Sequence, residues 1–352
     1  MLGRATNNNV STGGVANIEG IQPGGAVPFQ HGGTDDTDNS GVIRYVSIRH
    51  GGTEIGNGNE INGLTLGSVG NGTTIDFVEV ISNRDDGVEW FGGTVNTKHL
   101  ITAFCGDDAF DWDLGFRGKG QFWFAFQDIV GDAAGELDGG VGNNECSAPF
   151  SAPVVANVTF KGNGNTEAAG FFDNSAGQFW RSLFVDHRVG IEAEDRDAYG
   201  TLSAGSSPAT CGCDDRIDEG TLAFVDNVFF NVENNVRAAL FTYTGAGNRS
   251  GLSFTDSTTN TVIGDPLFGT GKVANGDVFE CVPSSGITLF PTSLATLIQD
   301  PFFEDTNYAG AFTPAFQGNV TASWASRWTM WSFVFANPGG NLGPGTGTES
   351  PE

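Results

Sequence analysis

The sequence predicts an all-β chain wound as a single-stranded right-handed parallel β-helix. Three observations lead to this prediction. Short β-branched and aromatic runs are separated by Gly and Asn turns, and similar two-part segments recur about every 20 to 22 residues. In addition, two acidic segments, 83–90 and 105–112, match in chemical type at an offset of 22. Because one turn of such a coil takes about this many residues, the two acidic segments are expected to stack.

The predicted strands follow one another with little between them. The first is 42–49, where apolar and polar residues alternate before a Gly-rich turn. The next strands are expected at 61–66, 74–80 and 97–102, with a second short apolar piece such as 88–91, and looser rungs at 154–160, 179–185 and 221–230. Only 294–299 shows an apolar period near that of a helix, so a doubly wound α/β fold is disfavoured.

The domain organisation expected is one solenoid with loop insertions. The β-helix domain is predicted over 1–340, and the Gly- and Thr-rich segment 341–352 is predicted to be a flexible tail or linker. Two acidic, Gly-rich stretches, 131–150 and 194–220, are expected to form loops on one flank of the coil. The architecture would be that of a pectate-lyase-like solenoid.

Composition limits the partners. With 16 basic and 42 acidic residues the formal charge is −26, which argues against nucleic acid and anionic membrane surfaces and favours cations and neutral polymers. The alternative is that acidity serves only to keep an exported protein soluble. No stretch of about 18 apolar residues occurs, so membrane insertion is not expected.

Five cysteines are too few for a disulfide framework and wrongly spaced for zinc. One or two loop-pinning disulfides are expected among Cys146, Cys211, Cys213 and Cys281. Cys105 aligns with Asn83 in the repeat and is expected to be a packed thiol.

Several segments resemble a family of secreted right-handed parallel β-helix proteins that is common in marine and gliding bacteria. They are 33–49, 107–112, 115–122 and 308–312, together with Trp324 and Trp328. The resemblance implies an extracellular or outer-surface location and no particular reaction. It also implies that residues 2–5 are internal to a larger parent chain, which agrees with the absence of a signal-peptide pattern at the start of the sequence.

The stacked acids are the strongest site candidate. Winding would place Asp85 by Asp107 and Asp86 by Asp108, at the inter-strand spacing of about 4.8 Å. Carboxylates this close repel unless a cation, an arginine or N–H donors neutralise them. We therefore predict a Ca²⁺ site formed by Asp85, Asp86, Asp107, Asp108 and Asp111. The alternative is that the aspartates only accept N–H bonds in turns. The oxygen-rich segment 35–41 is a weaker candidate because it lacks the EF-hand pattern.

The aromatic residues divide into two groups. Strand alternation predicts that Trp90 and Trp112 form an internal stack. The run 122–126 is so rich in rings that some must face outward, and Trp123 is predicted to be an exposed glycan contact.

The favoured function is a non-catalytic structural, adhesive or glycan-contacting role, with a polysaccharide or other surface polymer as partner, or self-assembly. The alternative is a calcium-dependent polysaccharide lyase or glycoside hydrolase. Under that alternative His99, Arg117 and Lys119 are the catalytic candidates, because they lie within one or two rungs of the acids. These basic residues could equally pair with local acids. No motif of serine hydrolases, nucleotide-driven enzymes or zinc proteases occurs.

Overall fold

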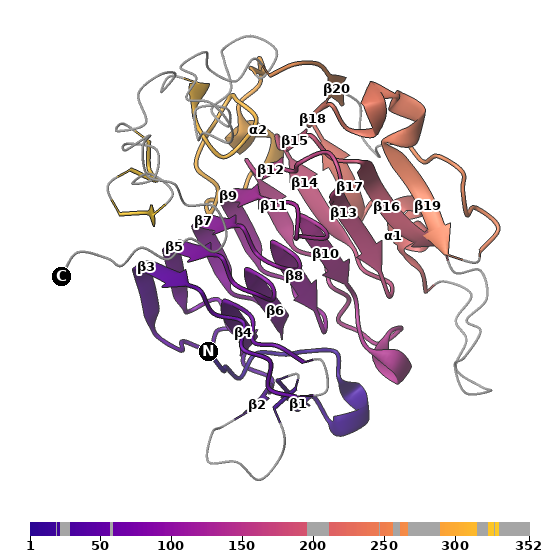
Figure 1. The fold of residues 1–352 in the computed structure, drawn as a ribbon. Coiled ribbons are helices and arrows are strands. Elements are labelled where there is room, and N and C mark those ends of the chain that lie inside the picture. The colour runs from indigo at the N-terminus through magenta and orange to yellow at the C-terminus, as the bar shows by residue number, and fades with distance from the viewer. Residues whose placement is uncertain are drawn as a thin grey trace.

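The computed structural model describes residues 1–18, 20–21, 29–56, 59–195, 211–245, 247–255, 261–266, 289–314, 323–326 and 328–330. The strands stack in parallel into two long sheets, which confirms the parallel β-helix (Figure 1). The seven-stranded sheet consists of β4 (Leu64–Val69), β6 (Val88–Gly93), β8 (Phe110–Asp113), β10 (Gly135–Asp138), β13 (Glu167–Phe172), β16 (Val189–Asp195) and β19 (Phe241–Gly245).

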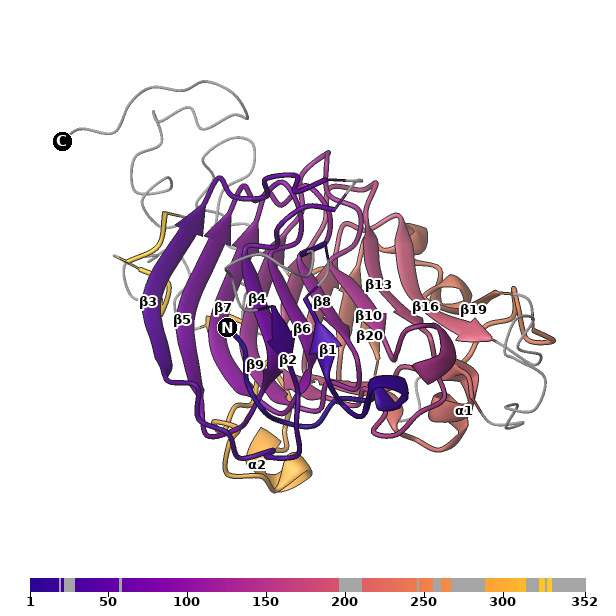
Figure 2. The ribbon, with the colours of Figure 1, turned by 90° about the horizontal axis from the view of Figure 1, so that it is seen from below.

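The eleven-stranded sheet forms the rest of the coil. Its strands are β3 (Val42–Arg49), β5 (Thr74–Ile81), β7 (Asn96–Ala103), β9 (Lys119–Phe126), β11 (Val154–Ala156), β12 (Thr159–Lys161), β14 (Gly177–Trp180), β15 (Leu183–Val185), β17 (Leu222–Val225), β18 (Val228–Phe230) and β20 (Val262–Ile263). A short antiparallel pair, β1 (Ala16–Asn17) and β2 (Gln30–His31), lies in front of the seven-stranded sheet (Figure 2).

Helix content is small, as expected. The described helices are α1 (Cys213–Asp218), α2 (Leu294–Ile298) and the 3₁₀ turns η1 (Val10–Thr12), η2 (Gly142–Asn144), η3 (Glu233–Asn235) and η4 (Arg237–Ala239). α2 lies where the sequence showed its one helical period, and Ser293 caps it by accepting a hydrogen bond from the Thr296 N–H. Within the described chain, no helix is long and apolar enough to cross a membrane.

The predicted offset of 22 is confirmed by the strand register. Glu89 pairs with Asp111, and Trp90 pairs with Trp112. Both tryptophans are fully buried inside the coil, as alternation predicted.

A corner divides the eleven-stranded sheet into two faces. One residue per rung adopts a left-handed conformation there, namely Tyr45, Phe77, His99, Phe122, Asn157, Arg181 and Asp226. The first half of β9 pairs with β11 and its second half with β12, so the predicted rungs 154–160, 179–185 and 221–230 are each two strands around a corner residue. Left-handed non-glycine residues cost roughly 1–3 kcal/mol each, so they persist only where the surrounding packing holds them.

The predicted exposure of Trp123 is wrong. Its ring is fully buried, stacks on Trp90 at 4.9 Å between centroids, and donates from Nε1 to Thr97 Oγ1 at 3.1 Å. The reason is the left-handed Phe122, which interrupts the alternation and turns the next side chain inward. Phe124 takes the outward position instead, and Phe312 of the C-terminal segment covers it.

The segment 131–150 is only partly a loop. Residues 135–138 form β10, which lies between β8 and β13 in the seven-stranded sheet. In the second insertion β16 extends to Asp195 and α1 begins at Cys213, whereas 196–210 lie outside the described residues. The predicted tail 341–352 also lies outside them.

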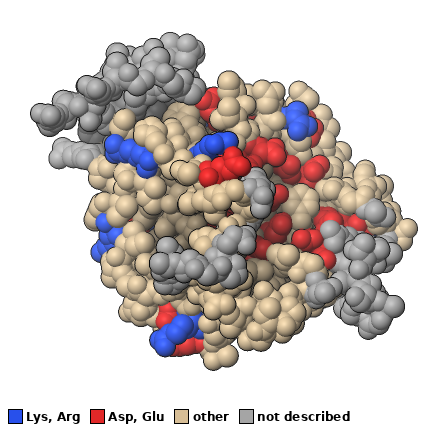
Figure 3. All heavy atoms as spheres, turned by 60° about the horizontal axis from the view of Figure 1, so that its bottom comes forward, with Lys and Arg blue, Asp and Glu red and all other residues tan. Residues whose placement is uncertain are grey.

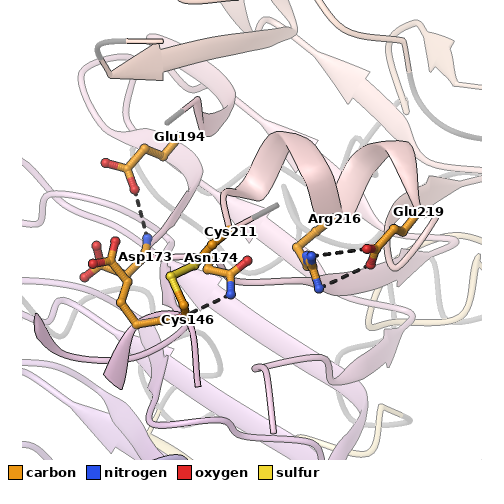
Figure 4. Close-up of a disulfide and its surroundings, with 8 residues drawn as sticks. Cys146, Asp173, Asn174, Glu194, Cys211, Arg216 and Glu219 are labelled. Carbon is orange, nitrogen blue, oxygen red and sulfur yellow. Dashed lines mark hydrogen bonds and ion pairs between the residues drawn. A yellow bond between two sulfur atoms is a disulfide. The ribbon is translucent and has the colours of Figure 1, made fainter. Parts of the chain in front are cut away.

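The cysteine predictions are confirmed where they can be followed. Cys146 and Cys211 form a disulfide that ties the two insertions together (Figure 4). Cys105 is a fully buried thiol, and Cys213 is buried and free. Cys281 lies outside the described residues.

Candidate functional site

The candidate site lies on the outer face of β6, β8 and β10. Strand alternation sends Trp90, Trp112 and Leu137 into the core, so the residues between them point outward. The register places Glu89 against Asp111 and Asp111 against Glu136. Three carboxylates are thereby stacked on successive strands.

A cavity of about 390 Å³ opens over this face. Its lining combines acidic residues with isoleucines of the N-terminal segment and of the segment before β4. The lining residues are Met1, Leu2, Ile18, Ile21, Ile55, Asn59, Glu60, Ile61, Asn62, Thr65, Asp85, Asp86, Glu89, Asp107, Asp111 and Glu136. Figure 3 shows Asp and Glu side chains gathered in a hollow of the surface. We call this cavity the acidic pocket.

Two overlapping groups of carboxylates lie within the acidic pocket. One oxygen each of Asp85, Asp86 and Asp107 lie within 4.8 Å of one another. The same limit holds for Asp86, Glu89 and Asp111. Asp86 belongs to both groups and is 7% exposed, so it is the centre of the arrangement.

Turn capping, the alternative interpretation of the acids, is present for two of them. Asp86 Oδ1 accepts a hydrogen bond from the Asp108 N–H at 3.0 Å. Asp108 Oδ1 accepts one from the Ala133 N–H at 2.7 Å. Asp108 is buried and does not line the acidic pocket, so its geometry is that of a turn cap.

The acidic pocket favours protonated or cation-bound carboxyls. Burial first, and then the neighbouring Asp85 carboxylate, raise the pKa of Asp86 well above its usual value. Burial and the adjacent Glu89 raise the pKa of Asp111 in the same way. Burial also raises the pKa of Asp107 and of Glu136. Each shift means that burial and the neighbouring carboxylates favour the protonated form of these side chains.

Residues 1–260 match the family model described as a pectate-lyase-like β-helix domain. The chain belongs to this family. No curated protein and no solved structure matches the chain. Membership fits a polysaccharide-related role for this pectate-lyase-like β-helix, and it leaves the chemistry of the site to be argued from the residues.

The basic residues predicted from sequence do not line the acidic pocket of this pectate-lyase-like β-helix. His99 lies at the corner of the eleven-stranded sheet, where its Nδ1 is 2.8 Å from Asp76 Oδ1. Arg117 pairs with Asp36 at 3.2 Å, and Lys119 pairs with Asp300 at 2.5 Å. These three residues lie within one or two rungs of the acids, as expected from the sequence, but they do not line the acidic pocket. Residues a few positions away in sequence lie on different faces because the coil turns between them.

The oxygen-rich segment 35–41 does not gather its carboxylates. Asp35 accepts from Thr37, Asp36 pairs with Arg117, and Asp38 pairs with Arg4. Each carboxylate therefore has its own local partner.

Two residues of the acidic pocket were not among the predicted ligands. Glu89 belongs to a carboxylate group, and Glu136 stacks on Asp111. A signal for Glu136 exists in the sequence, because 135–138 repeats the alternation of acidic and apolar residues found in 110–113. Glu136 lies 25 residues after Asp111, whereas Asp111 lies 22 after Glu89, so a search at a fixed offset of 22 misses Glu136.

A third carboxylate group lies farther along the coil. One oxygen each of Glu145, Asp173 and Glu194 lie within 4.8 Å of one another. Glu194 Oε2 accepts a hydrogen bond from the Asp173 N–H at 3.0 Å, beside the Cys146–Cys211 disulfide (Figure 4).

Proposed function

We propose that this protein is an exported glycan-binding β-helix that binds Ca²⁺ in the acidic pocket and acts without catalysis. The observation that carries the proposal is the pair of carboxylate groups whose oxygens lie within 4.8 Å. Ca²⁺ holds oxygen ligands at about 2.3–2.6 Å, so two oxygens on one ion are at most about 5 Å apart. The oxygens of Asp86 and its neighbours therefore have the spacing of ligands that share an ion.

The ligand types favour a hard cation. The described residues that line the acidic pocket offer carboxylates, the amides of Asn59 and Asn62, and backbone carbonyls, with no histidine or cysteine among them. Oxygen-only sites of variable geometry suit Ca²⁺, whereas thiolates and imidazoles suit zinc and copper.

The mixed lining supports a carbohydrate partner. Sugars present both apolar C–H faces and polar edges, and the lining of the acidic pocket offers both isoleucines and carboxylates. A bound Ca²⁺ would also let a chain of charge −26 contact an anionic polysaccharide without repulsion. Export is supported by the Cys146–Cys211 disulfide, because such bonds persist in oxidising compartments.

A second candidate, a glycoside hydrolase, has one observation in its favour. Asp111 has a raised pKa and lies close to the Glu89 carboxylate, as an acid and nucleophile pair of a retaining enzyme does. A lyase has less support, because His99, Arg117 and Lys119 lie away from the acidic pocket. Arg84 is nearer, since it pairs with the pocket residue Glu60 at 2.9 Å.

The test combines calcium binding with polymer retention. Isothermal titration should detect Ca²⁺ binding to the wild type, and both Asp86→Asn and Asp111→Asn should weaken it by about tenfold or more. Asp35→Asn is the matched control, because it removes the same charge from an exposed turn. Retention on alginate or pectate gels should require Ca²⁺, and polymer length should stay constant.

Two results would contradict the proposal. Calcium binding that is unchanged in both pocket variants would remove the site. If the wild type shortens the polymer and Asp111→Asn does not, the protein is a hydrolase and not a non-catalytic binding protein.

A further inference from the structure

One end of the coil has an unpaired strand edge. β3 is the first strand of the eleven-stranded sheet and pairs with β5 along one edge, and no described strand pairs with its other edge. Val42 is 67% exposed and Tyr45 is 60% exposed. Val46 is 37% exposed, whereas Val78, its partner in register on β5, is 1% exposed. The outer edge of β3 therefore exposes backbone N–H and C=O groups, and the core-facing Val46 is only partly covered.

At the opposite end of the coil, the chain itself covers the last strand of the seven-stranded sheet. Residues 251–254 turn back along β19 in the antiparallel direction. The Tyr243 N–H donates to the Leu252 carbonyl at 2.9 Å, and the Phe254 N–H donates to the Phe241 carbonyl at 3.0 Å. Phe254 also packs its ring on both aromatic residues. β3 and β19 lie at the two ends of the molecule (Figures 1 and 2).

We propose that the free edge of β3 binds an extended polypeptide strand in the parallel direction, and that this strand carries an acidic residue followed by an aromatic one. β5 shows the chemistry that β3 accepts on its other edge. Asp76 pairs with Arg44 at 2.8 Å, and the Phe77 ring stacks on Tyr45 at 4.6 Å with an interplanar angle of 8°. A strand on the free edge would repeat both contacts, because a parallel ladder keeps equivalent residues level.

Charge complementarity agrees with an acidic strand. β3 carries Arg44 and Arg49, and His50 follows directly, in a chain whose net charge is −26. The Arg44 side chain is 48% exposed even though it pairs with Asp76. An added carboxylate level with Asp76 would lie beside the half-exposed Arg44 guanidinium.

A second copy of this chain does not fit the edge. In a twofold dimer that joins the two β3 edges into one sheet, with the core-facing side chains of both copies on the same face, the two β3 strands run antiparallel. If their corners at Tyr45 coincide, Arg44 of one copy lies opposite the core-facing Val46 of the other. Ile43, which packs on the core, then lies opposite Ser47. Head-to-tail stacking would leave the seven-stranded sheet unpaired, because residues 251–254 occupy the edge of β19.

The experiment uses a labelled synthetic peptide with the sequence of residues 72–83, which contains β5. Fluorescence anisotropy measures its binding to the full chain, and hydrogen exchange measures the amides of 42–49. We expect saturable binding and slower exchange in β3. A peptide with Lys and Gly at the positions of Asp76 and Phe77 should bind about tenfold or more weakly.

Protein variants distinguish peptide binding at the β3 edge from non-specific apolar binding. Tyr45→Gly keeps the left-handed backbone possible and removes the ring, so it should weaken peptide binding by about tenfold. Leu252→Ser removes an exposed apolar side chain at the opposite end of the coil and should leave binding unchanged. Equal binding of the peptide with Lys and Gly at the positions of Asp76 and Phe77, no binding at about 1 mM, or protection elsewhere than β3 would overturn the proposal. Dimerisation through β3 without peptide would overturn it too.

Discussion

Two columns of stacked side chains differ in what the same geometry does to them. On the seven-stranded sheet, Glu89, Asp111 and Glu136 stack on successive strands. At the corner of the eleven-stranded sheet, Phe77 stacks on His99 at 4.2 Å, and His99 on Phe122 at 5.1 Å. A parallel coil places similar residues over one another in both columns.

The difference lies in the chemistry that is repeated. Stacked rings attract one another and need no outside partner. Burial, and then repulsion between neighbouring carboxylates, raise the pKa values of Asp111 in the column and of Asp86 beside it, so protonation or a bound cation would stabilise this region. One column is a source of stability in itself, and the other depends on solution conditions. The predictions below test that contrast.

The largest effect is expected inside the coil. Trp123→Ala should lower the free energy of unfolding by about 3–5 kcal/mol, because it removes a fully buried ring that stacks on Trp90 and Phe110. Chemical denaturation measures the change, which should be the same with calcium and with EDTA. A loss below about 1 kcal/mol would contradict the burial of this residue.

Loss of the disulfide should have the second-largest effect on the free energy of unfolding. Replacing Cys146 and Cys211 by serine opens a link across 65 residues and should cost about 2–4 kcal/mol. The calcium affinity of the acidic pocket should not change, because the bond lies beside the third carboxylate group. A parallel fall in calcium affinity would mean that the two acidic regions are coupled.

The aromatic corner should contribute a smaller amount. Phe77→Leu keeps an apolar side chain and loses the stacks on Tyr45 and His99, so we expect a loss of about 1 kcal/mol. The loss should be equal with calcium and with EDTA. Thermal unfolding at several calcium concentrations makes the comparison, and a calcium-dependent loss would break the contrast between the columns.

Neutralising Asp86, which lies beside the acidic column in the same pocket, should change stability in opposite directions with and without calcium. Asp86→Asn keeps an oxygen that can accept from the Asp108 N–H but removes one charge. In EDTA this variant should be more stable than the wild type by about 1 kcal/mol, and with calcium it should be less stable. Asp35→Asn should show no such reversal, and a variant less stable under both conditions would contradict the calcium site.

The smallest effect is the pH dependence of the metal-free protein. The folded-state pKa values of Asp86 and Asp111 are raised, so the folded protein binds more protons than the unfolded chain above the unfolded pKa near 4. Relative to Asp86→Asn, the stability of the wild type should therefore rise, by about 1 kcal/mol, as the pH falls from 7 to 5 in EDTA. The comparison with this variant cancels the opposite contribution of the buried His31 and His187, whose pKa values are lowered by burial. Saturating calcium should abolish the difference, and a wild type that loses stability relative to the variant over this range in EDTA would count against the shifts.

The fold was predictable because it follows from local patterns. The offset of 22 between 83–90 and 105–112 predicts the stacking of Glu89 on Asp111, and the register confirms it. The site was only partly predictable. Glu136 belongs to the same column, but three extra residues in its turn hide it from a fixed period. His99 is one rung from the acids in sequence and on another face in space.

By itself, the sequence determined the coil, its rung length and which residues share a strand face, because these depend on alternation and repeat length within a few residues. Only the tertiary structure decided the corner, which turned Trp123 inward, and the C-terminal segment, which covers Phe124. It also decided which acids share one pocket. These outcomes depend on contacts between segments far apart in the chain, where packing overrides local pattern.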